Sequence, residues 1–180
     1  FTVEMKILDD AGTELPWDGK TFGRLVVRGA GVAKSYFKGE GGNILDKDGF
    51  FDTGDVATID AYGTMQITDR AKDVIKSGGE WISSVELENA LLGHPEVLEA
   101  AVIGLPHEKW QERPLAGGVA RPGTRPTRES LRAYLETRVA RWWLPDDVVL
   151  VEAIPKTSVG KIAKRELRER FCAHRWPDGE

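Results

Sequence analysis

The sequence predicts an α+β fold, with a β-rich part over residues 1–68 and a short sheet flanked by helices over residues 69–180. Two observations support this division. Before Asp69, short alternating runs of apolar and polar residues lie between glycine-containing turns, which is typical of strands. After Arg70, apolar residues also recur at helical spacing, which indicates amphipathic helices. The composition, 41% apolar and 30% charged, is that of a folded globular protein.

The β-rich part contains four expected strands. The first two are residues 1–8, "FTVEMKIL", which alternate and end at a turn, and residues 23–29, "GRLVVRG", which lie between glycines. The other two, residues 55–60 and 64–68, are separated by the tight turn "AYG". This pair predicts a β-hairpin directly before the change of periodicity.

The first expected helix begins at Ser83, because Glu86 follows three residues later in the pattern of a capping box. Gly93 and then Pro95 mark its end. The apolar face is expected to consist of four residues, with the carboxylates of the helix facing solvent. These four are Val85, Leu87, Leu91 and Leu92.

The remaining elements alternate between strands and helices. Residues 97–106, 114–121 and 147–155 are expected to be strands, and residues 127–143 to be a second amphipathic helix. The last helix is expected to begin at Ile162, because Ala163, Leu167 and Phe171 recur at intervals of four.

Composition and charge exclude several classes of function. The net charge of −4 argues against nucleic-acid binding, although Lys156–Arg170 holds six basic residues against two acids and leaves room for a local anion site. Cys172 is the one cysteine and the three histidines are scattered, so no metal site is expected. No apolar run approaches the ~18 residues of a membrane span and no leader is apparent, so we expect a cytoplasmic protein. There is no Walker-type loop, dinucleotide fingerprint or catalytic triad.

Asp55 is the first candidate site residue, in the turn-like stretch "FDTGD". A carboxylate there can accept hydrogen bonds from two vicinal hydroxyls, such as those of a ribose. The alternative is a turn aspartate that binds its own backbone.

The second candidate cluster lies at the change of periodicity and just after it. Asp69 is a candidate hinge residue, and the planar guanidinium of Arg70 suits a phosphate or a ribose. Gly78-Gly79 would let another molecule approach the backbone closely. The alternative is a salt-bridged linker followed by a flexible loop.

Lys161 is the third candidate, in the stretch "PKTSVGK". If a helix begins at Ile162, Lys161 lies at its N-terminal edge, where backbone N–H groups and an ammonium together favour an anion. Such a lysine can stabilise charge that develops on a phosphoryl or acyl oxygen. The alternative is one solvated cation among six on a basic segment.

Four motifs, taken in order, resemble the C-terminal part of the adenylate-forming enzyme superfamily, which includes acyl-CoA synthetases and luciferase-like enzymes. The stretches "SGGEWISSVELEN" and "RWWLPDDVVLVEAIPKTSVGK" look most like the medium- and long-chain fatty-acid–CoA ligases. The chain departs from the family at Gln111, where relatives often have glycine. The four motifs are "GRLVVRGAGVAKSYF", "FDTGD", "TDRAKDVIKSGGEWISSVELE" and "PKTSVGK".

The resemblance implies a ligase that works in two steps. ATP, with Mg²⁺, and a fatty acid or related carboxylate first give an acyl-adenylate and pyrophosphate, and CoA then gives the thioester and AMP. In this scheme Lys161 is catalytic, Asp55 and Arg70 bind the nucleotide, and Asp69 is the hinge. The segment of Gly78, Gly79, Glu80 and Trp81 lines the pantetheine channel.

The resemblance also implies that the chain is a piece of a longer protein. Residues 1–68 would be a β-barrel-like end of the large domain, and residues 69–180 the mobile C-terminal domain. Because the family's phosphate loop, adenine pocket and acyl tunnel are not among these residues, the chain alone is expected to be inactive. Two other classes stay open: a non-catalytic module that binds CoA or an acyl carrier, and a nucleic-acid-binding domain that uses the basic helix. Handling of fatty acids is compatible with peripheral membrane contact.

Overall fold

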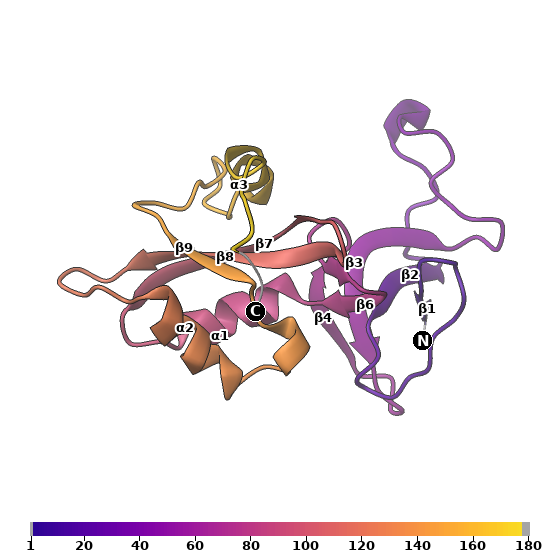
Figure 1. Ribbon diagram of the computed structural model, residues 1–180. Helices are drawn as coiled ribbons and strands as arrows, with labels where there is room; N and C mark the ends of the chain where they lie inside the picture. Colours follow the sequence, from indigo (N-terminus) through magenta and orange to yellow (C-terminus); the bar gives the residue numbers. More distant parts are fainter. Residues whose placement is uncertain (1, 178–180) are drawn as a thin grey trace. The chain divides into compact units, whose positions relative to one another are not determined.

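A computed structural model describes residues 2–177. The chain divides into two compact units, Phe1–Lys72 and Asp73–Glu180, which are described separately. The first unit is built on one sheet, and the second combines a sheet with three α-helices (Figure 1). The α+β class expected from the sequence is therefore confirmed.

The sheet of the first unit is antiparallel and has the strand order β1-β2-β3-β4. Its end strands do not pair with each other among the described residues, so the part expected to be barrel-like is an open sheet. Its core is formed by Ile7, Leu25, Ala57 and Ile59. The strands are β1 (Val3–Leu8), β2 (Gly23–Gly29), β3 (Phe51–Ile59) and β4 (Met65–Arg70), and a short 3-10 helix η1 (Phe37–Gly39) lies between β2 and β3.

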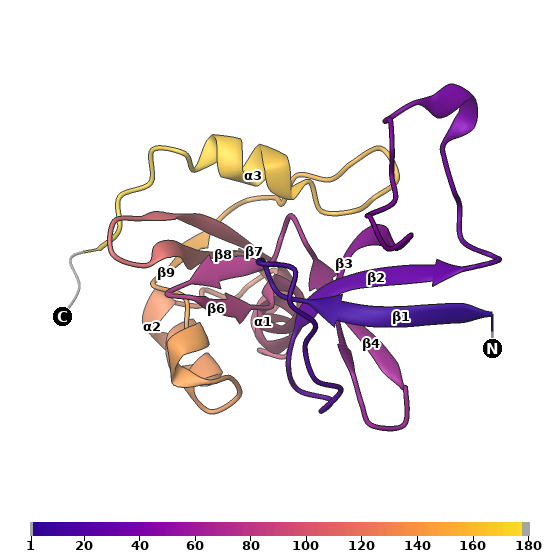
Figure 2. The ribbon, with the colours of Figure 1, turned by 90° about the vertical axis from the view of Figure 1, so that its right-hand side faces the viewer.

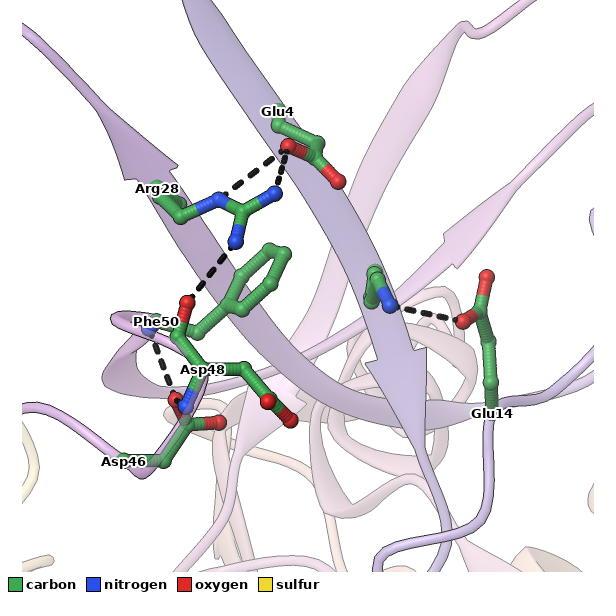
Figure 3. Close-up of polar contacts among 7 residues, drawn as sticks. Glu4, Glu14, Arg28, Asp46, Asp48 and Phe50 are labelled. Atoms are coloured by element: carbon green, nitrogen blue, oxygen red, sulfur yellow. Dashed lines mark hydrogen bonds and ion pairs between the residues drawn. The ribbon is translucent and has the colours of Figure 1, made fainter.

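Phe50 is buried and connects the segment before β3 to strands β1 and β2 of this sheet. The guanidinium of Arg28 lies 4.5 Å and the ammonium of Lys6 lies 5.0 Å from the centre of its ring. Arg28 also pairs with Glu4 and donates a hydrogen bond of 2.8 Å to the carbonyl of Asp48 (Figure 3). Cations against an aromatic face are attracted by its electron density, so these contacts hold the β2–β3 connection at its C-terminal end.

The second unit contains a five-stranded sheet. The antiparallel path is β6-β5-β8-β7, and β9 adds to β8 in the parallel direction. A parallel neighbour requires a crossover connection, which α2 supplies between β8 and β9. The strands are β5 (Ile75–Ser77), β6 (Glu80–Ile82), β7 (Val97–His107), β8 (Gln111–Ala120) and β9 (Asp147–Leu150).

Helices cover both faces of this second sheet. α1 and α2 lie on one face, and α3 lies on the opposite face (Figures 1 and 2). Below α3, a core cluster joins β7 and β8 to Leu167 of that helix, and it includes Ile103, Leu115 and Ile154. The helices are α1 (Ser84–Leu92), α2 (Arg128–Glu136) and α3 (Lys164–Arg170), with a 3-10 turn η2 (Arg141–Trp143) after α2.

The N-terminus of α1 is where the sequence predicts it, because the side chain of Ser83 accepts a hydrogen bond of 3.1 Å from the Glu86 backbone. Its buried face differs from the prediction. Val85 and Leu92 are exposed, whereas Glu88 is 8% exposed and lies in the interior. The expectation that all carboxylates of this helix face solvent is therefore wrong. The physical reason is a buried cation from α3, described below.

Two other helix bounds differ from the sequence expectation. The second helix ends at Glu136, where the Arg138 side chain donates to the Tyr134 carbonyl and so satisfies a terminal acceptor. The third begins at Lys164 and not at Ile162, because Ile162 forms a β-bridge with Lys156. The last strand is also shorter than expected and ends at Leu150.

Candidate functional site

Lys161 lies at the end of a tight turn, three residues before α3. The Thr157 N–H donates to the Lys161 carbonyl over 2.7 Å, and the Lys161 N–H donates to the Thr157 hydroxyl over 3.2 Å. Gly160 completes the turn with a left-handed φ of 79°, a conformation that glycine adopts without strain. The predicted position at a helix N-terminus is therefore wrong. Lys161 is instead held by its own loop, with its side chain exposed.

The ion pairs of this segment distinguish Lys161 from four of its five basic neighbours. Among the described residues, the Lys161 ammonium has no acidic partner, whereas four of the six basic residues of this segment are paired. The pairs are Lys156 with Glu99 at 2.8 Å, Lys164 with Glu88 at 2.8 Å, Arg165 with Glu169 at 3.5 Å and Arg168 with Asp73 at 2.9 Å. The segment is therefore not a uniform solvated face. Lys161 is a positioned cation that is free to meet an anion from outside.

Asp55 and Arg70 are brought together by strand pairing. They are directly opposite each other on β3 and β4, and the Arg70 Nε lies 3.2 Å from the Asp55 Oδ1. Among the described residues, the second carboxylate oxygen of Asp55 has no partner, and the Arg70 side chain is 60% exposed. Asp55 is thus a strand residue with a free acceptor, and not a turn residue that binds its own backbone.

Asp69 is almost completely buried within β4. Its side chain accepts a hydrogen bond of 2.7 Å from the Arg70 N–H, and its backbone lies opposite Val56 of β3. The two compact units meet in the sequence after Lys72, three residues beyond Asp69. The role of Asp69 as a hinge stays a prediction.

Gly78 and Gly79 form the two-residue turn between β5 and β6. Both have positive φ values, 60° and 88°, as the tight turns of β-hairpins require. The Gly78 N–H donates to the Trp110 carbonyl over 2.9 Å, and a Cβ on Gly78 would lie 3.0 Å from the Trp110 ring. A Cβ on Gly79 would meet nothing within 4 Å, so that side of the turn is open. Glu80, beside the turn, is exposed, and Trp81 is half-buried with the Lys76 ammonium 5.3 Å from its ring centre.

A cavity of about 500 Å³ borders this turn within the second unit. Its size is in the range of small-molecule sites, and two half-exposed tryptophans form part of its wall. It is lined by Ser77, Gly78, Glu80, Trp110, Arg113, Trp142 and Asp146.

Arg113 holds the walls of this cavity together. Its guanidinium forms a two-point contact with Asp146 at 2.7 and 2.9 Å and donates to the carbonyls of Trp142 and Leu144, each at 3.0 Å. It also donates to the Ser77 hydroxyl at 3.0 Å, so one side chain connects β5, β8 and the segment after α2. Sequence reasoning missed Arg113, because a single arginine in a strand gives no signal of the distant groups that it joins.

Gln111 has a left-handed backbone, with φ 73°, at the end of the three-residue turn between β7 and β8. This conformation costs a residue with a side chain ~1–2 kcal/mol, against ~0.5–1 kcal/mol of entropy lost by glycine. We therefore expect Gln111→Gly to stabilise the second unit by about 0.5–1 kcal/mol in urea unfolding. The other glutamine, Gln66 in β4, is the matched control, and Gln66→Gly should destabilise by a similar amount. Equal destabilisation by both changes would contradict the interpretation.

The candidate residues divide between the two units. Asp55, Asp69 and Arg70 belong to the first unit, and the Gly78-Gly79 turn and Lys161 belong to the second. Among the described residues there is no group of three or more metal-binding side chains. None of the helices described is long and apolar enough to cross a membrane.

The sequence has close relatives among CoA ligases. Residues 86–161 match the family described as "AMP-binding enzyme C-terminal domain". The 3-methylmercaptopropionyl-CoA ligase of Ruegeria pomeroyi is 54% identical over 95% of this chain, and the medium-chain-fatty-acid–CoA ligase of Ectopseudomonas oleovorans is 50% identical over 95%. The chain covers 32% and 31% of these two proteins, so it spans about a third of the relatives that it matches.

Solved protein structures share the fold of this chain. The ATP-bound MatB of Rhodopseudomonas palustris superimposes with a TM-score of 0.81 and is 31% identical in sequence. The match covers 95% of this chain and 34% of that protein. The similarity therefore extends over both units described here.

Proposed function

From the premise that this chain belongs to the adenylate-forming acyl-CoA synthetase family and carries its C-terminal domain, we propose that it supplies the adenylating lysine of an AMP-forming acid–thiol ligase. The observation that carries the proposal is the Lys161 ammonium, which is exposed and has no acidic partner in the described residues, while its backbone is fixed by Thr157. A charge held in this way can act on an external anion without first leaving another partner.

In the first half-reaction a carboxylate oxygen attacks the α-phosphorus of ATP, and the bond from that phosphorus to the bridging oxygen of pyrophosphate breaks. Two anions must approach each other, so a cation between the carboxylate and the α-phosphate lowers the barrier. Lys161 is assigned this role. The free acceptor oxygen of Asp55 would bind the ribose hydroxyls, and the exposed guanidinium of Arg70 beside it would contact the nucleotide.

In the second half-reaction the CoA sulfur attacks the acyl carbon, AMP leaves with the bonding electrons, and the thiol proton is released. We assign the turn of Gly78 and Gly79, together with Glu80 and Trp81, to the wall of the pantetheine channel. The open side of Gly79 and the adjoining cavity of about 500 Å³ support this assignment. Between the two steps, rotation of the second unit about the hinge at Asp69 would withdraw Lys161 from the reacting groups and bring the turn of Gly78 and Gly79 to them.

The proposed substrates are a fatty acid or related carboxylate, ATP and CoA. The names of the relatives support a CoA ligase, and the medium-chain-fatty-acid–CoA ligase among them supports an aliphatic acid. Mg²⁺ would arrive with ATP, since no group of three ligands for it occurs in the described residues. A cytoplasmic location and peripheral membrane contact stay predictions.

Pyrophosphate exchange tests the proposal. The longer protein that carries this chain should exchange labelled pyrophosphate into ATP when a medium-chain fatty acid is added. The 180-residue chain alone should not, because the proposal places most of the ATP site and the acyl tunnel outside it. If the isolated chain exchanged pyrophosphate as fast as the longer protein, the claim that most of the ATP site lies outside this chain would be wrong. If the longer protein showed no acid-dependent exchange, the proposed ligase activity would be wrong.

A non-catalytic module that binds CoA is the alternative that the structure favours most, because all the residues that line the cavity beside Gly78 belong to the second unit. Titration calorimetry of CoA into the isolated chain distinguishes it. Micromolar binding without any acid-dependent exchange in the longer protein would support the module. The alternative of nucleic-acid binding is less favoured, because four ion pairs neutralise most of the basic segment.

A further inference from the structure

One face of α3 carries two cations that both point into the second unit. Lys164 and Arg168 are one turn apart, and the buried side chain of Leu167 lies on the same face. The Lys164 side chain is 10% exposed, although it is the first residue of the helix and follows the Lys161 loop directly. A buried ammonium must be held by partners, so the contacts of this face determine where α3 and the preceding loop lie.

Lys164 binds two groups of α1. Its ammonium lies 2.8 Å from the Glu88 Oε1 and donates to the Ser84 hydroxyl over 2.6 Å. The same oxygen of Glu88 accepts a hydrogen bond of 2.8 Å from the Val102 N–H of β7. One carboxylate therefore joins α1, the end strand β7 of the sheet and the start of α3, and it holds the Lys164 ammonium at this edge of the sheet.

Arg168 connects the same face of α3 to Asp73, at the start of the second unit. Its Nη2 lies 2.9 Å from the Oδ1 of Asp73, a residue that is 9% exposed. Asp73 is the first residue of the second unit and follows the proposed hinge residue Asp69 by four positions. The segment that leaves the hinge and the helix that follows Lys161 are thus held together directly.

We propose that Lys164 and Arg168 are positioning residues for Lys161, which couple its loop to the segment that leaves the hinge. A rotation about Asp69 then displaces Asp73, α3 and the Lys161 loop as one body, and the Lys161 ammonium reaches its substrates at a fixed distance. The loop itself adds stiffness, since the Ala163 N–H donates to the Pro155 carbonyl over 2.8 Å. This inference rests on the proposed function of Lys161.

The kinetic test uses the longer protein that carries this chain. Misplacement of a reacting group by about 1 Å can cost ~100-fold, so Lys164→Gln should slow acid-dependent pyrophosphate exchange by about 10- to 100-fold. Thioester formation from supplied acyl-adenylate should change less than about three-fold, because that step does not use the Lys161 ammonium. Lys164→Arg should recover most of the exchange rate, since it restores the charge and donors towards Glu88.

A matched control lies on the solvent-exposed side of the same helix. Arg165 is 92% exposed and pairs only loosely with Glu169, so Arg165→Gln should leave both half-reactions unchanged. Arg168→Gln, in a less buried position, serves as the second variant if Lys164→Gln does not fold. Equal losses in both half-reactions, or an unchanged exchange rate in the folded variants, would overturn the proposal.

Hydrogen exchange separates this proposal from the proposed function. In Lys164→Gln the amides of Thr157, Gly160 and Ala163 should exchange about ten-fold faster, because their loop loses its anchor, while the β7–β8 ladder stays protected. If Lys161→Ala left adenylation intact, the function assigned to Lys161 would fail, and the exchange of these amides would still decide whether Lys164 positions the loop. Unchanged loop exchange in the folded variant would overturn the positioning role.

Discussion

Replacing Lys161 with alanine in the longer protein that carries this chain is expected to slow the proposed acyl-adenylate formation by about 10²–10³-fold, the typical effect of removing one preorganised donor. Thioester formation from supplied acyl-adenylate should stay within about three-fold, because the carboxylate and the α-phosphate are already joined in that substrate. The two half-reactions are measured separately, by pyrophosphate exchange and by release of AMP from acyl-adenylate and CoA. The structural basis is an exposed ammonium that has no acidic partner in the described residues.

Lys156 provides the matched control for this experiment. It lies in the same loop and is also an exposed lysine, but its ammonium is 2.8 Å from Glu99. Lys156→Ala should therefore change adenylation by less than about three-fold, as expected for an exposed ion pair. If Lys161→Ala reduced both half-reactions equally, or if Lys156→Ala reduced adenylation as strongly, the assignment of Lys161 would be wrong.

Replacing Glu88 with alanine is expected to lower the free energy of unfolding of the second unit by about 3–5 kcal/mol, the usual cost of leaving a buried charge without its partner. The Lys164 ammonium would keep the Ser84 hydroxyl and lose the carboxylate, and the Val102 N–H would lose its acceptor. Urea unfolding of the 180-residue chain, followed by circular dichroism, gives this quantity directly.

Two further variants decide whether charge burial is the cause. Glu169→Ala removes an exposed carboxylate of α3 and should cost no more than ~0.5 kcal/mol. Glu88→Leu combined with Lys164→Met replaces the pair by apolar groups and should recover part of the loss, because no charge is then left in the interior while the Val102 N–H still lacks its acceptor. A loss in Glu88→Ala no greater than in Glu169→Ala would contradict the interpretation.

Local signals in the sequence predict the elements of the fold well. The pattern of Ser83 and Glu86 places the start of α1 correctly, because a helix cap depends on residues that are neighbours in the chain. The end of α2 and the start of α3 are less predictable. Helical spacing continues past Glu136 and begins before Lys164, but the hydrogen bond from the Arg138 side chain to the Tyr134 carbonyl and the bridge between Lys156 and Ile162 accompany the actual bounds.

The candidate site shows the same distinction between local and long-range information. Asp55 and Arg70 are recognisable as separate motif residues, and their ion pair follows from the register of β3 and β4, which the sequence does not specify. Glu88 was expected in solvent because a glutamate on a helix is usually exposed. Its partner Lys164 is 76 positions away, and no periodicity within α1 reveals a contact at that separation.

The turn of Gly78 and Gly79 bears on how binding energy would be used. Paired glycines in a sequence suggest a mobile segment, yet here both lie in the turn that closes the ladder of β5 and β6, and the Gly78 N–H donates to the Trp110 carbonyl. A ligand that meets a wall already in its final shape loses little chain entropy on binding, so more of its contact energy appears as affinity. Both glycines provide the left-handed backbone of the turn, and Gly78 also allows a close approach to the Trp110 ring.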